Sequence, residues 1–274
     1  MTAPRLSRPL LLVGCGKMGE AMLRGWLASG IAAAGIVVID PSGATAVATL
    51  PGVSVHRDAS TLPQDLEPEV MVLAVKPQMM AEACAPLTRF TGADTLILSI
   101  AAGKTLAWFA DIFGAKAPVV RSMPNTPAAI GRGITVAVPN AATSADQSAI
   151  AKALLEAVGE ALLAEDEGLI DAVTAVSGSG PAYVFLMIEC MTEAGVQAGL
   201  PRAMASRLAM VTVAGAGALA LESGEDPAIL RRNVTSPNGT TQEALSVLMA
   251  EDGLQPLMTR AIAAAARRSR ELAG

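Results

Sequence analysis

Aromatic residues are scarce in this chain of 274 residues, where two Trp, one Tyr and four Phe make up 3% of the sequence. The net charge is −5, whereas nucleic-acid binding typically needs a basic face and aromatic rings for base stacking. His56 is the single histidine, which excludes a metal site built from several histidines. The composition therefore argues against a nucleic-acid-binding protein and against a histidine-based metal centre.

Cysteine is also rare, and Cys15, Cys84 and Cys190 are far apart and follow no pattern. This usage favours a reducing cytoplasm, with neither disulfides nor a metal site. Long apolar runs are lacking as well, because the best candidate, 208–221, has 14 residues and a membrane helix needs about 20. The apolar patch near the N-terminus is short and runs into glycines, which favours a β-strand over a signal peptide. We therefore expect a cytoplasmic protein without a membrane segment.

Charged residues make up only 16% of the chain and apolar residues 52%, a low charged fraction for a protein that stays alone in solution. Segment 203–221 is apolar nearly all round, so other helices must enclose it. About 110 residues of helical chain are too few to enclose that helix and also cover their own outer apolar faces. We therefore expect a homodimer or a larger homo-oligomer.

The first half of the chain alternates short β-branched runs with helical periods. The runs predict six strands, near 9–14, 35–40, 70–75, 95–100, 117–122 and 133–138. A helix is predicted over 18–30. Continuous apolar strands separated by helices indicate a parallel sheet that is covered on both faces. The expected fold class is therefore α/β, with a Rossmann-type parallel-sheet domain at the N-terminus.

From residue 147 the pattern changes to the i, i+3, i+4 spacing of an amphipathic helix, which continues to Leu162. Beyond 162–167 nothing reads as a strand, so the remainder is predicted to be all-helical. We place the domain boundary near residue 163. The expected organisation is a dinucleotide-binding domain over 1–163 and a helical substrate-binding and dimerisation domain over 164–274.

The motif "GCGKMG", which begins at Gly14, matches G-x-G-x-x-G directly after a strand and directly before a helix. Gly14 permits the tight turn, Gly16 lets a pyrophosphate approach the backbone, and Gly19 lets the helix pack on the strand. The helix start at Lys17 and Met18 supplies amides and a partial positive charge for an anion. The motif in this context predicts a dinucleotide site; a glycine-rich turn without a ligand is the alternative.

Cofactor selectivity is expected at the end of the second strand. Asp40 lies about 20 residues beyond the glycines, where an acid usually binds the adenosine ribose and favours NADH. Ser42, Thr45 and Arg57 are potential partners nearby for the 2′-phosphate of NADPH. Both cofactors therefore remain open, with Asp40 favouring NADH.

Two later strands end in "AVKPQ" (74–78) and "SIAAG" (99–103). Both ends fall at the carboxyl edge, where ligands of open α/β sheets bind. Lys76 in the first of them is either a cofactor contact or a solvated surface lysine.

The helical half of the chain contains no lysine and no histidine. All five lysines precede it: Lys17, Lys76, Lys104, Lys116 and Lys152. An enzyme that reduces a ketone needs a proton donor of tuned pKa, commonly Lys or His, so a carbonyl acceptor is disfavoured. A protonated imine is already electrophilic and needs only to be held and aligned with the nicotinamide. Neutral hydroxyls suffice for that, and a nearby lysine would repel the iminium.

The stretch "NVTSPNGTTQEAL" (233–245) provides such hydroxyls in a turn without an ionisable side chain between Asn233 and Gln242. Thr240-x-x-Glu243 predicts a capping box at the start of the next helix. Free amides at that helix start form a cradle for a carboxylate without requiring Arg. A well-capped helix with no further role is the alternative.

Six motifs in order along the whole chain together resemble pyrroline-5-carboxylate reductase: "GCGKMG", "AVKPQ", "SIAAG", "RSMPNTP" (121–127), "VSGSGPAYVF" (176–185) and "VTSPNGTT" (234–241). The resemblance implies reduction of 1-pyrroline-5-carboxylate to L-proline by NADPH or NADH, the last step of proline synthesis. It also implies a Rossmann domain followed by helical halves that interlock in a dimer, with dimers often assembled into larger rings.

The resemblance further implies roles for individual residues. Thr241 would be the catalytic residue, with its hydroxyl bonded to the ring nitrogen of the substrate. Ser236 and the amides around Gly239, Thr240 and Thr241 would seat the carboxylate. The residues predicted to lie near the ring are Ser177, Gly178 and Gly180. The predicted cofactor contacts are Gly14, Gly16, Lys17, Met18, Gly19, Asp40, Ser42, Arg57, Ala74, Val75, Lys76, Pro77, Met123, Pro124 and Asn125.

Within that set, 123–125 would line the nicotinamide and the backbone of 74–77 would lie beside its ribose. Asn238 stands where the family usually has Gly, and Asn is the least costly replacement if the position needs a positive φ. Asp40 is a second departure, since many relatives carry a polar or basic residue there. Three other readings stay open: a related six-membered imine as substrate, a hydroxyacid dehydrogenase, and an inactive nucleotide-binding redox sensor.

Overall fold

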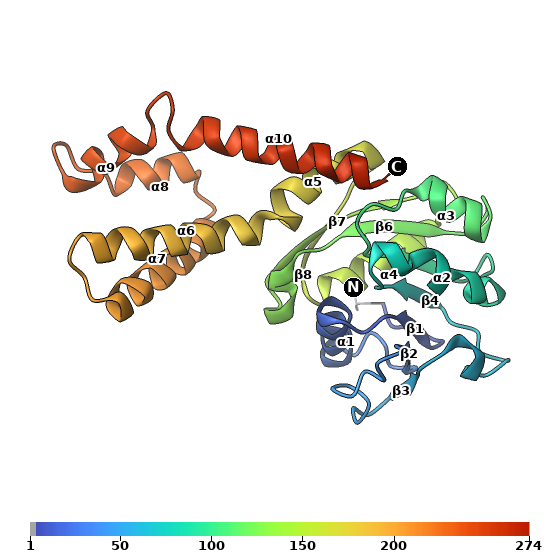
Figure 1. The fold of residues 1–274 in the computed structure, drawn as a ribbon. Coiled ribbons are helices and arrows are strands. Elements are labelled where there is room, and N and C mark those ends of the chain that lie inside the picture. The colour runs from blue at the N-terminus through green and yellow to red at the C-terminus, as the bar shows by residue number, and fades with distance from the viewer. Residues whose placement is uncertain (1–3, 274) are drawn as a thin grey trace. The chain divides into compact units, whose positions relative to one another are not determined.

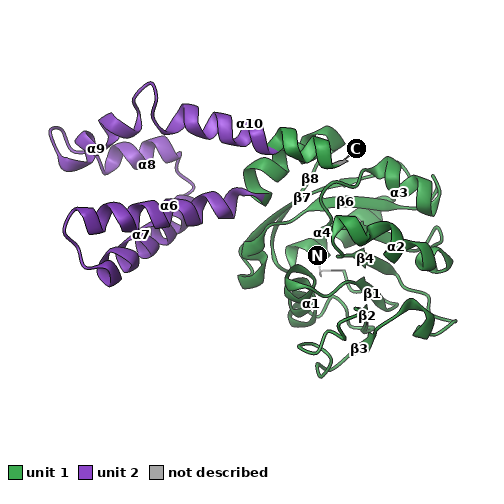
Figure 2. Ribbon diagram, in the orientation of Figure 1, with its two compact units in different colours: residues 1–178, 266–274 green, residues 179–265 purple. Residues whose placement is uncertain are grey.

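The computed structural model describes residues 4–273, and the chain forms two compact units (Figure 2). Unit 1 consists of Met1–Gly178 together with Ala266–Gly274, and unit 2 is Ser179–Ala265. The final helix, α10 (Leu254–Ala273), contributes to both units. Its last turns belong to unit 1, where Ser269 Oγ donates a hydrogen bond to Asp171 Oδ1 at 2.6 Å.

Unit 1 contains one eight-stranded sheet with the order β3-β2-β1-β4-β5-β6-β7-β8 (Figure 1). The strands are β1 (Leu10–Val13), β2 (Ile36–Ile39), β3 (Val53–His56), β4 (Val70–Leu73), β5 (Leu96–Ser99), β6 (Val119–Met123), β7 (Gly133–Pro139) and β8 (Gly159–Leu163). Neighbours from β3 to β6 are parallel, β7 runs antiparallel to β6, and β8 is parallel to β7. The order 3-2-1-4-5-6 is that of a Rossmann sheet, which confirms the predicted fold class.

Alternate residues of the strands enter two separate hydrophobic cores, one on each face of the sheet. Leu10 and Leu12 belong to one core, and Leu11 and Val13 belong to the other. The first core is closed by α1 (Lys17–Ser29) and α4 (Ala145–Glu156), and the second by α2 (Met80–Cys84) and α3 (Leu106–Phe113). Burial on both faces explains why these strands read as continuous apolar runs.

The predicted helix that continued to Leu162 is wrong. Helix α4 ends at Glu156, and Gly159–Leu163 instead form β8, which pairs with β7. Gly159 has a φ of +147°, and a Cβ there would collide with the backbone of Gly133. The apolar residues that follow are too few to distinguish a strand from a last helical turn by their period.

Beyond Leu163 the described chain is helical, as predicted. The long helices of this part are α6 (Gly180–Gln197), α7 (Arg202–Ser223) and α10, with the shorter α5 (Ile170–Val173), α8 (Pro227–Asn233) and α9 (Thr240–Leu248). A π-helix, η6 (Thr174–Gly178), precedes α6. The short 3-10 helices are η1 (Ala59–Thr61), η2 (Pro77–Met79), η3 (Ala85–Phe90), η4 (Thr126–Ile130) and η5 (Glu167–Leu169).

Helices α6 and α7 expose a large amount of apolar surface, including Phe185, Leu208 and Leu221, the last of which is 72% exposed. By length and composition alone, Glu167–Gln197 and Arg202–Ser223 could each cross a membrane. The expectation that no apolar segment is long enough was therefore wrong, although the core helix of a soluble protein passes the same test. The exposed surface agrees with the prediction that another copy covers these helices.

Candidate active site

The glycine-rich loop lies at the point where the strand order of the sheet reverses. β1 is bonded to β2 on one side and to β4 on the other, which is the switch point where open α/β sheets bind ligands. Gly14 follows β1 with a φ of +88°. A Cβ at Gly14 would lie 2.8 Å from Val75 Cγ1 and 2.9 Å from Ala74 O. The motifs that begin at Gly14 and Ala74 therefore meet, and glycine alone fits the contact.

Gly16 leaves room for an anion at the start of α1. It is the N-cap residue, and no side chain of residues 4–273 caps the helix there. A Cβ at Gly16 would meet no described atom within 4 Å. The first helical bond runs from Glu20 N to Gly16 O at 2.8 Å, so the amides of 17–19 are left for a ligand. This open, amide-rich loop fits the pyrophosphate of a dinucleotide.

Gly19 packs α1 onto the loop, because a Cβ there would lie 2.6 Å from Gly14 O. Met18 is partly buried and packs against the core that α1 and α4 close. Lys17 and Lys76 are both exposed. Lys76 immediately precedes η2, where it serves as the N-cap residue without a side-chain bond to the helix. Its side chain is thus exposed and makes no capping bond to η2.

Asp40 bonds the glycine-rich loop as well as its own turn. Its Oδ2 accepts from Cys15 N at 2.7 Å, and its Oδ1 accepts from Ser42 N at 2.9 Å and from Ser42 Oγ at 2.5 Å. Burial raises the pKa of Asp40, but these hydrogen bonds outweigh burial and hold the pKa below its usual value. Asp40 is therefore an ionised acceptor, and its Oδ2 keeps capacity for one more donor.

A pocket of about 170 Å³ opens beside Asp40 at the ends of the strands. Arg57 and Val75 line it together with residues that the sequence analysis did not identify: Val13, Ile39, Pro41, Asp58, Ala59, Met79, Glu82, Ala83 and Pro86. The Arg57 guanidinium also lies over Gly43, 3.4 Å from where a Cβ would be. Of the missed residues, Val13 and Ile39 end strands and Pro41 and Asp58 lie in the turns that follow, a position that could have identified them, whereas the others lie in short helices.

The "RSMPNTP" motif continues from the end of β6 into a buried turn. Pro124 and Asn125 are buried, and Asn125 Oδ1 accepts from Ile134 N at 2.9 Å. The side chain of Met123 reaches the π-helix, since a Cβ at Gly178 would lie 2.6 Å from Met123 Cε. Ser177 Oγ donates to Val173 O at 3.0 Å. The structure thus brings Met123 together with Gly178 and leaves Ser177 bonded to its own helix.

In unit 2, the stretch from Ser236 to Thr241 forms a tight turn and then starts α9. Gly239 N donates to Ser236 O at 3.0 Å, and Asn238 has a φ of +56°. Pro237 and Asn238 thus hold the positions where a type II turn takes Pro and a residue of positive φ. The condition set in the sequence analysis, a positive φ at Asn238, is therefore met.

The predicted capping box of Thr240 and Glu243 is wrong, because α9 begins one residue earlier than the motif requires. Gly239 is the N-cap residue, and no described side chain caps the helix. Gln242 Oε1 instead accepts from Asn238 N at 2.8 Å. The amides of Thr240, Thr241 and Gln242 therefore lack a capping side chain, which suits them to an anionic ligand.

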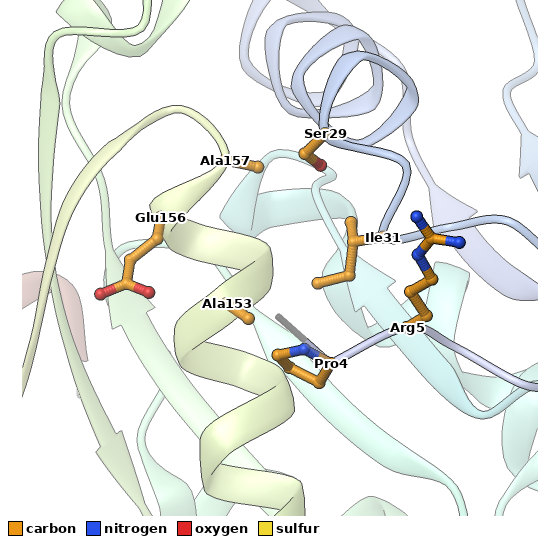
Figure 3. A pocket seen from close by; sticks show the side chains of 7 residues that line it. All are labelled: Pro4, Arg5, Ser29, Ile31, Ala153, Glu156 and Ala157. Atoms are coloured by element: carbon orange, nitrogen blue, oxygen red, sulfur yellow. The ribbon is translucent and has the colours of Figure 1, made fainter. Parts of the chain in front are cut away.

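A larger hollow of about 880 Å³ lies elsewhere in unit 1 (Figure 3). Its lining comes from Pro4 and Arg5, from the end of α1 and from the end of α4. None of the predicted site residues lines it, so volume alone does not mark the functional site.

Comparison with known proteins matches two family models to the chain. Residues 167–272 match the family model described as "Pyrroline-5-carboxylate reductase dimerisation". Residues 10–103 match the family model described as "NADP oxidoreductase coenzyme F420-dependent". A pyrroline-5-carboxylate reductase of Pseudomonas aeruginosa is 44% identical over all of this chain and 98% of its own length. The chain belongs to the pyrroline-5-carboxylate reductase family.

Other members of the family match over nearly their whole length. The Escherichia coli pyrroline-5-carboxylate reductase is 36% identical over 97% of this chain and 99% of its own. The solved structure of the Coxiella burnetii enzyme superposes with a TM-score of 0.90 at 33% identity, covering 98% of this chain and all of that one. The residues that match the dimerisation model include α6 and α7, whose apolar surface is exposed in a single copy of the chain.

Proposed function

We propose that this chain reduces 1-pyrroline-5-carboxylate to L-proline with NAD(P)H, the last step of proline biosynthesis. The observation that carries the proposal is the start of α9, where Gly239 leaves amides uncapped beside the hydroxyls of Ser236, Thr240 and Thr241. That arrangement suits a small imino acid with a carboxylate, and the glycine-rich loop of the same chain suits the dinucleotide.

The residues around the switch point would hold the cofactor, whose reduced nicotinamide supplies the hydride. Amides at Gly16, Lys17, Met18 and Gly19 would bind the pyrophosphate. The free capacity of Asp40 Oδ2 would accept one ribose hydroxyl, and the pocket lined by Arg57 and Val75 would take the adenine end. The structure supports use of NADH through the ionised Asp40 and use of NADPH through Arg57 and Ser42, so both remain in the proposal.

The 123–125 turn would form the wall against the nicotinamide, with the backbone of 74–77 beside the ribose. Two features favour this arrangement: Pro124 and Asn125 are buried and held by the bond to Ile134, and Met123 touches Gly178. A rigid wall restricts the ring to the geometry that hydride transfer needs.

The substrate carboxylate would lie on the amides of Gly239, Thr240 and Thr241, with Ser236 as a further donor. The Thr241 hydroxyl would bond the ring nitrogen. Residues 164–274 contain no lysine or histidine, so the iminium keeps its charge without repulsion from an ammonium group. The protein thus contributes placement, since the substrate is already polarised for hydride attack.

We further propose a cytoplasmic homodimer or a ring of dimers that associates with neither nucleic acid nor membrane. The net charge of −5 and the small aromatic content support the first exclusion. The family match at 167–272 supports a functional division near residue 163, with cofactor binding over 1–163 and substrate binding and dimerisation over 164–274.

The decisive test is an assay of reduced-nicotinamide absorbance with the purified chain, using NADPH and NADH separately. We expect oxidation that depends on 1-pyrroline-5-carboxylate, with L-proline as the product by chromatography. The corresponding six-membered cyclic imine measures substrate breadth. Turnover of a 3-hydroxyacid with NAD and none of the imine would contradict the proposal and favour the dehydrogenase, and cofactor binding without any turnover would favour the sensor.

A further inference from the structure

Arg121 is the one charged residue that is buried among residues 4–273, with 4% of its surface exposed. It lies in β6, two residues before Met123. A buried guanidinium needs a partner, because its desolvation is otherwise uncompensated. Its Nη1 donates to Glu167 Oε1 at 2.6 Å, while its Nε has no hydrogen-bond partner within the described part of the chain. Compensation for burying this charge therefore rests on Glu167.

Glu167 connects three segments through one oxygen atom. It begins η5, the first turn after the sheet, and its Oε1 also accepts the backbone N–H of Leu106 at 2.8 Å. Leu106 is the first residue of α3, where a carboxylate is favoured by the helix dipole. The start of α3, the buried strand β6 and the segment 167–178 are thus joined at this carboxylate.

The strand β6 and the segment 167–178 meet a second time, two residues further along the strand and at the end of the segment. Met123 closes the strand, and its Cε lies against Gly178 at the end of the π-helix. Met123 is proposed to line the nicotinamide and Gly178 to lie near the substrate ring. The two contacts, Arg121 with Glu167 and Met123 with Gly178, together fix how these proposed walls lie relative to each other.

We propose that Arg121 and Glu167 are positioning residues for hydride transfer, which hold the nicotinamide wall at Met123 against the π-helix that carries Gly178. The inference rests on the proposed function. It predicts that loosening the pair leaves cofactor affinity nearly intact, since the pyrophosphate loop after β1 is a separate element. The chemical step should suffer instead, because a misplacement of about 1 Å can cost about 100-fold in rate.

The first test is Glu167→Gln, which keeps an acceptor oxygen and removes the charge. We expect kcat to fall by about tenfold or more, with the KM for the reduced cofactor changed by less than about threefold. The primary isotope effect with cofactor deuterated at C4 should rise as hydride transfer becomes slower than the other steps. The matched control is Glu156→Gln, which breaks the exposed Lys152–Glu156 pair on α4 (3.4 Å) and should change neither value.

The double variant R121M/E167Q separates positioning from stability. Glu167→Gln leaves the buried Arg121 charge without its partner and should lower the melting temperature. Removing both charges should bring the melting temperature back toward that of the wild type, while kcat stays low. Recovery of kcat together with the melting temperature would overturn the proposal, as would a wild-type kcat in Glu167→Gln.

A measurement that does not depend on turnover separates the positioning role of Arg121 and Glu167 from the proposed function. Bound NADPH or NADH reports immobilisation of its ring by fluorescence anisotropy, and Glu167→Gln should lower the anisotropy at saturation. If the wild type fails to reduce the imine but the variant still loses anisotropy, the positioning role stands and the proposed function fails. An unchanged anisotropy contradicts the positioning role whatever the substrate.

Discussion

Two glycines of the same loop should respond to alanine in opposite ways. Gly14 has a φ of +88°, and a Cβ there would lie within 2.9 Å of Ala74 O. Gly16 has a φ of −72° and a ψ of −169°, which any residue adopts, and a Cβ there would face open space. The loop therefore predicts that Gly14→Ala impairs folding, whereas Gly16→Ala impairs only cofactor binding.

The magnitudes follow from the two environments. For Gly14→Ala, about 1–2 kcal/mol of backbone strain adds to about 1–3 kcal/mol of overpacking. For Gly16→Ala, the apo protein should keep its stability or gain about 0.4–1 kcal/mol through the unfolded chain. Moving the pyrophosphate off the amides removes a charged hydrogen bond of about 1.5–3 kcal/mol, which weakens binding roughly 10- to 100-fold. Gly16→Val should abolish binding altogether.

The assay pairs urea unfolding of the apo protein with fluorescence titration of NADPH and NADH. Protein concentration has to be equal for all variants, because oligomer stability depends on it. Wild-type affinity in Gly16→Ala would remove the loop from the cofactor site. A marked loss of apo stability in the same variant would show that the space in front of Gly16 is needed for packing instead.

The remaining predictions concern four residues. Thr241→Ala should lower turnover about 10- to 1,000-fold while Thr241→Ser retains most of it; unchanged kinetics in the alanine variant would remove Thr241 from the mechanism. Asn238→Gly should keep both activity and stability, and Asn238→Val should lose about 1–2 kcal/mol in denaturant unfolding because of its φ of +56°. Asp40→Ser should shift the ratio of kcat/KM values toward NADPH; an unaltered ratio places selectivity elsewhere. Burial, together with the nearby Asp40 and Glu20 carboxylates, raises the pKa of Cys15 to about 11, so its alkylation by iodoacetamide, followed by mass spectrometry, should be slow at neutral pH and accelerate toward pH 11.

Strands β1, β2, β4 and β5 could be predicted because each is apolar throughout or nearly so and lies between turn signals. All six predicted strands are present. β3 was missed since its residues, from Val53 to His56, are only partly buried or exposed and leave no apolar run to detect. β8 was missed because Gly159 looks like an interruption within a helical pattern, and only its pairing with Gly133 reveals a strand.

In the candidate site, backbone requirements were easier to predict than side-chain partners. The need for glycine at Gly14 and for a positive φ at Asn238 follows from local geometry, which sequence reports directly. The bond from Cys15 N to Asp40 joins residues 25 positions apart, and that from Arg121 to Glu167 spans 46 positions. Hydrogen bonds between residues so far apart in the chain depend on the tertiary fold, so no local sequence pattern predicts them.

The start of α9 shows how the absence of a capping side chain bears on function. A Ser or Asp at the N-cap would place its own oxygen on the first-turn amides and compete with a ligand. Gly239 supplies no such oxygen, and Gln242 is bonded to Asn238 N instead. The amides therefore stay available at little cost to the helix, because Gly at this position is only a few tenths of a kcal/mol worse than Ser. If a capping side chain in this turn accepted from the first-turn amides, those amides would not be free to bind a carboxylate.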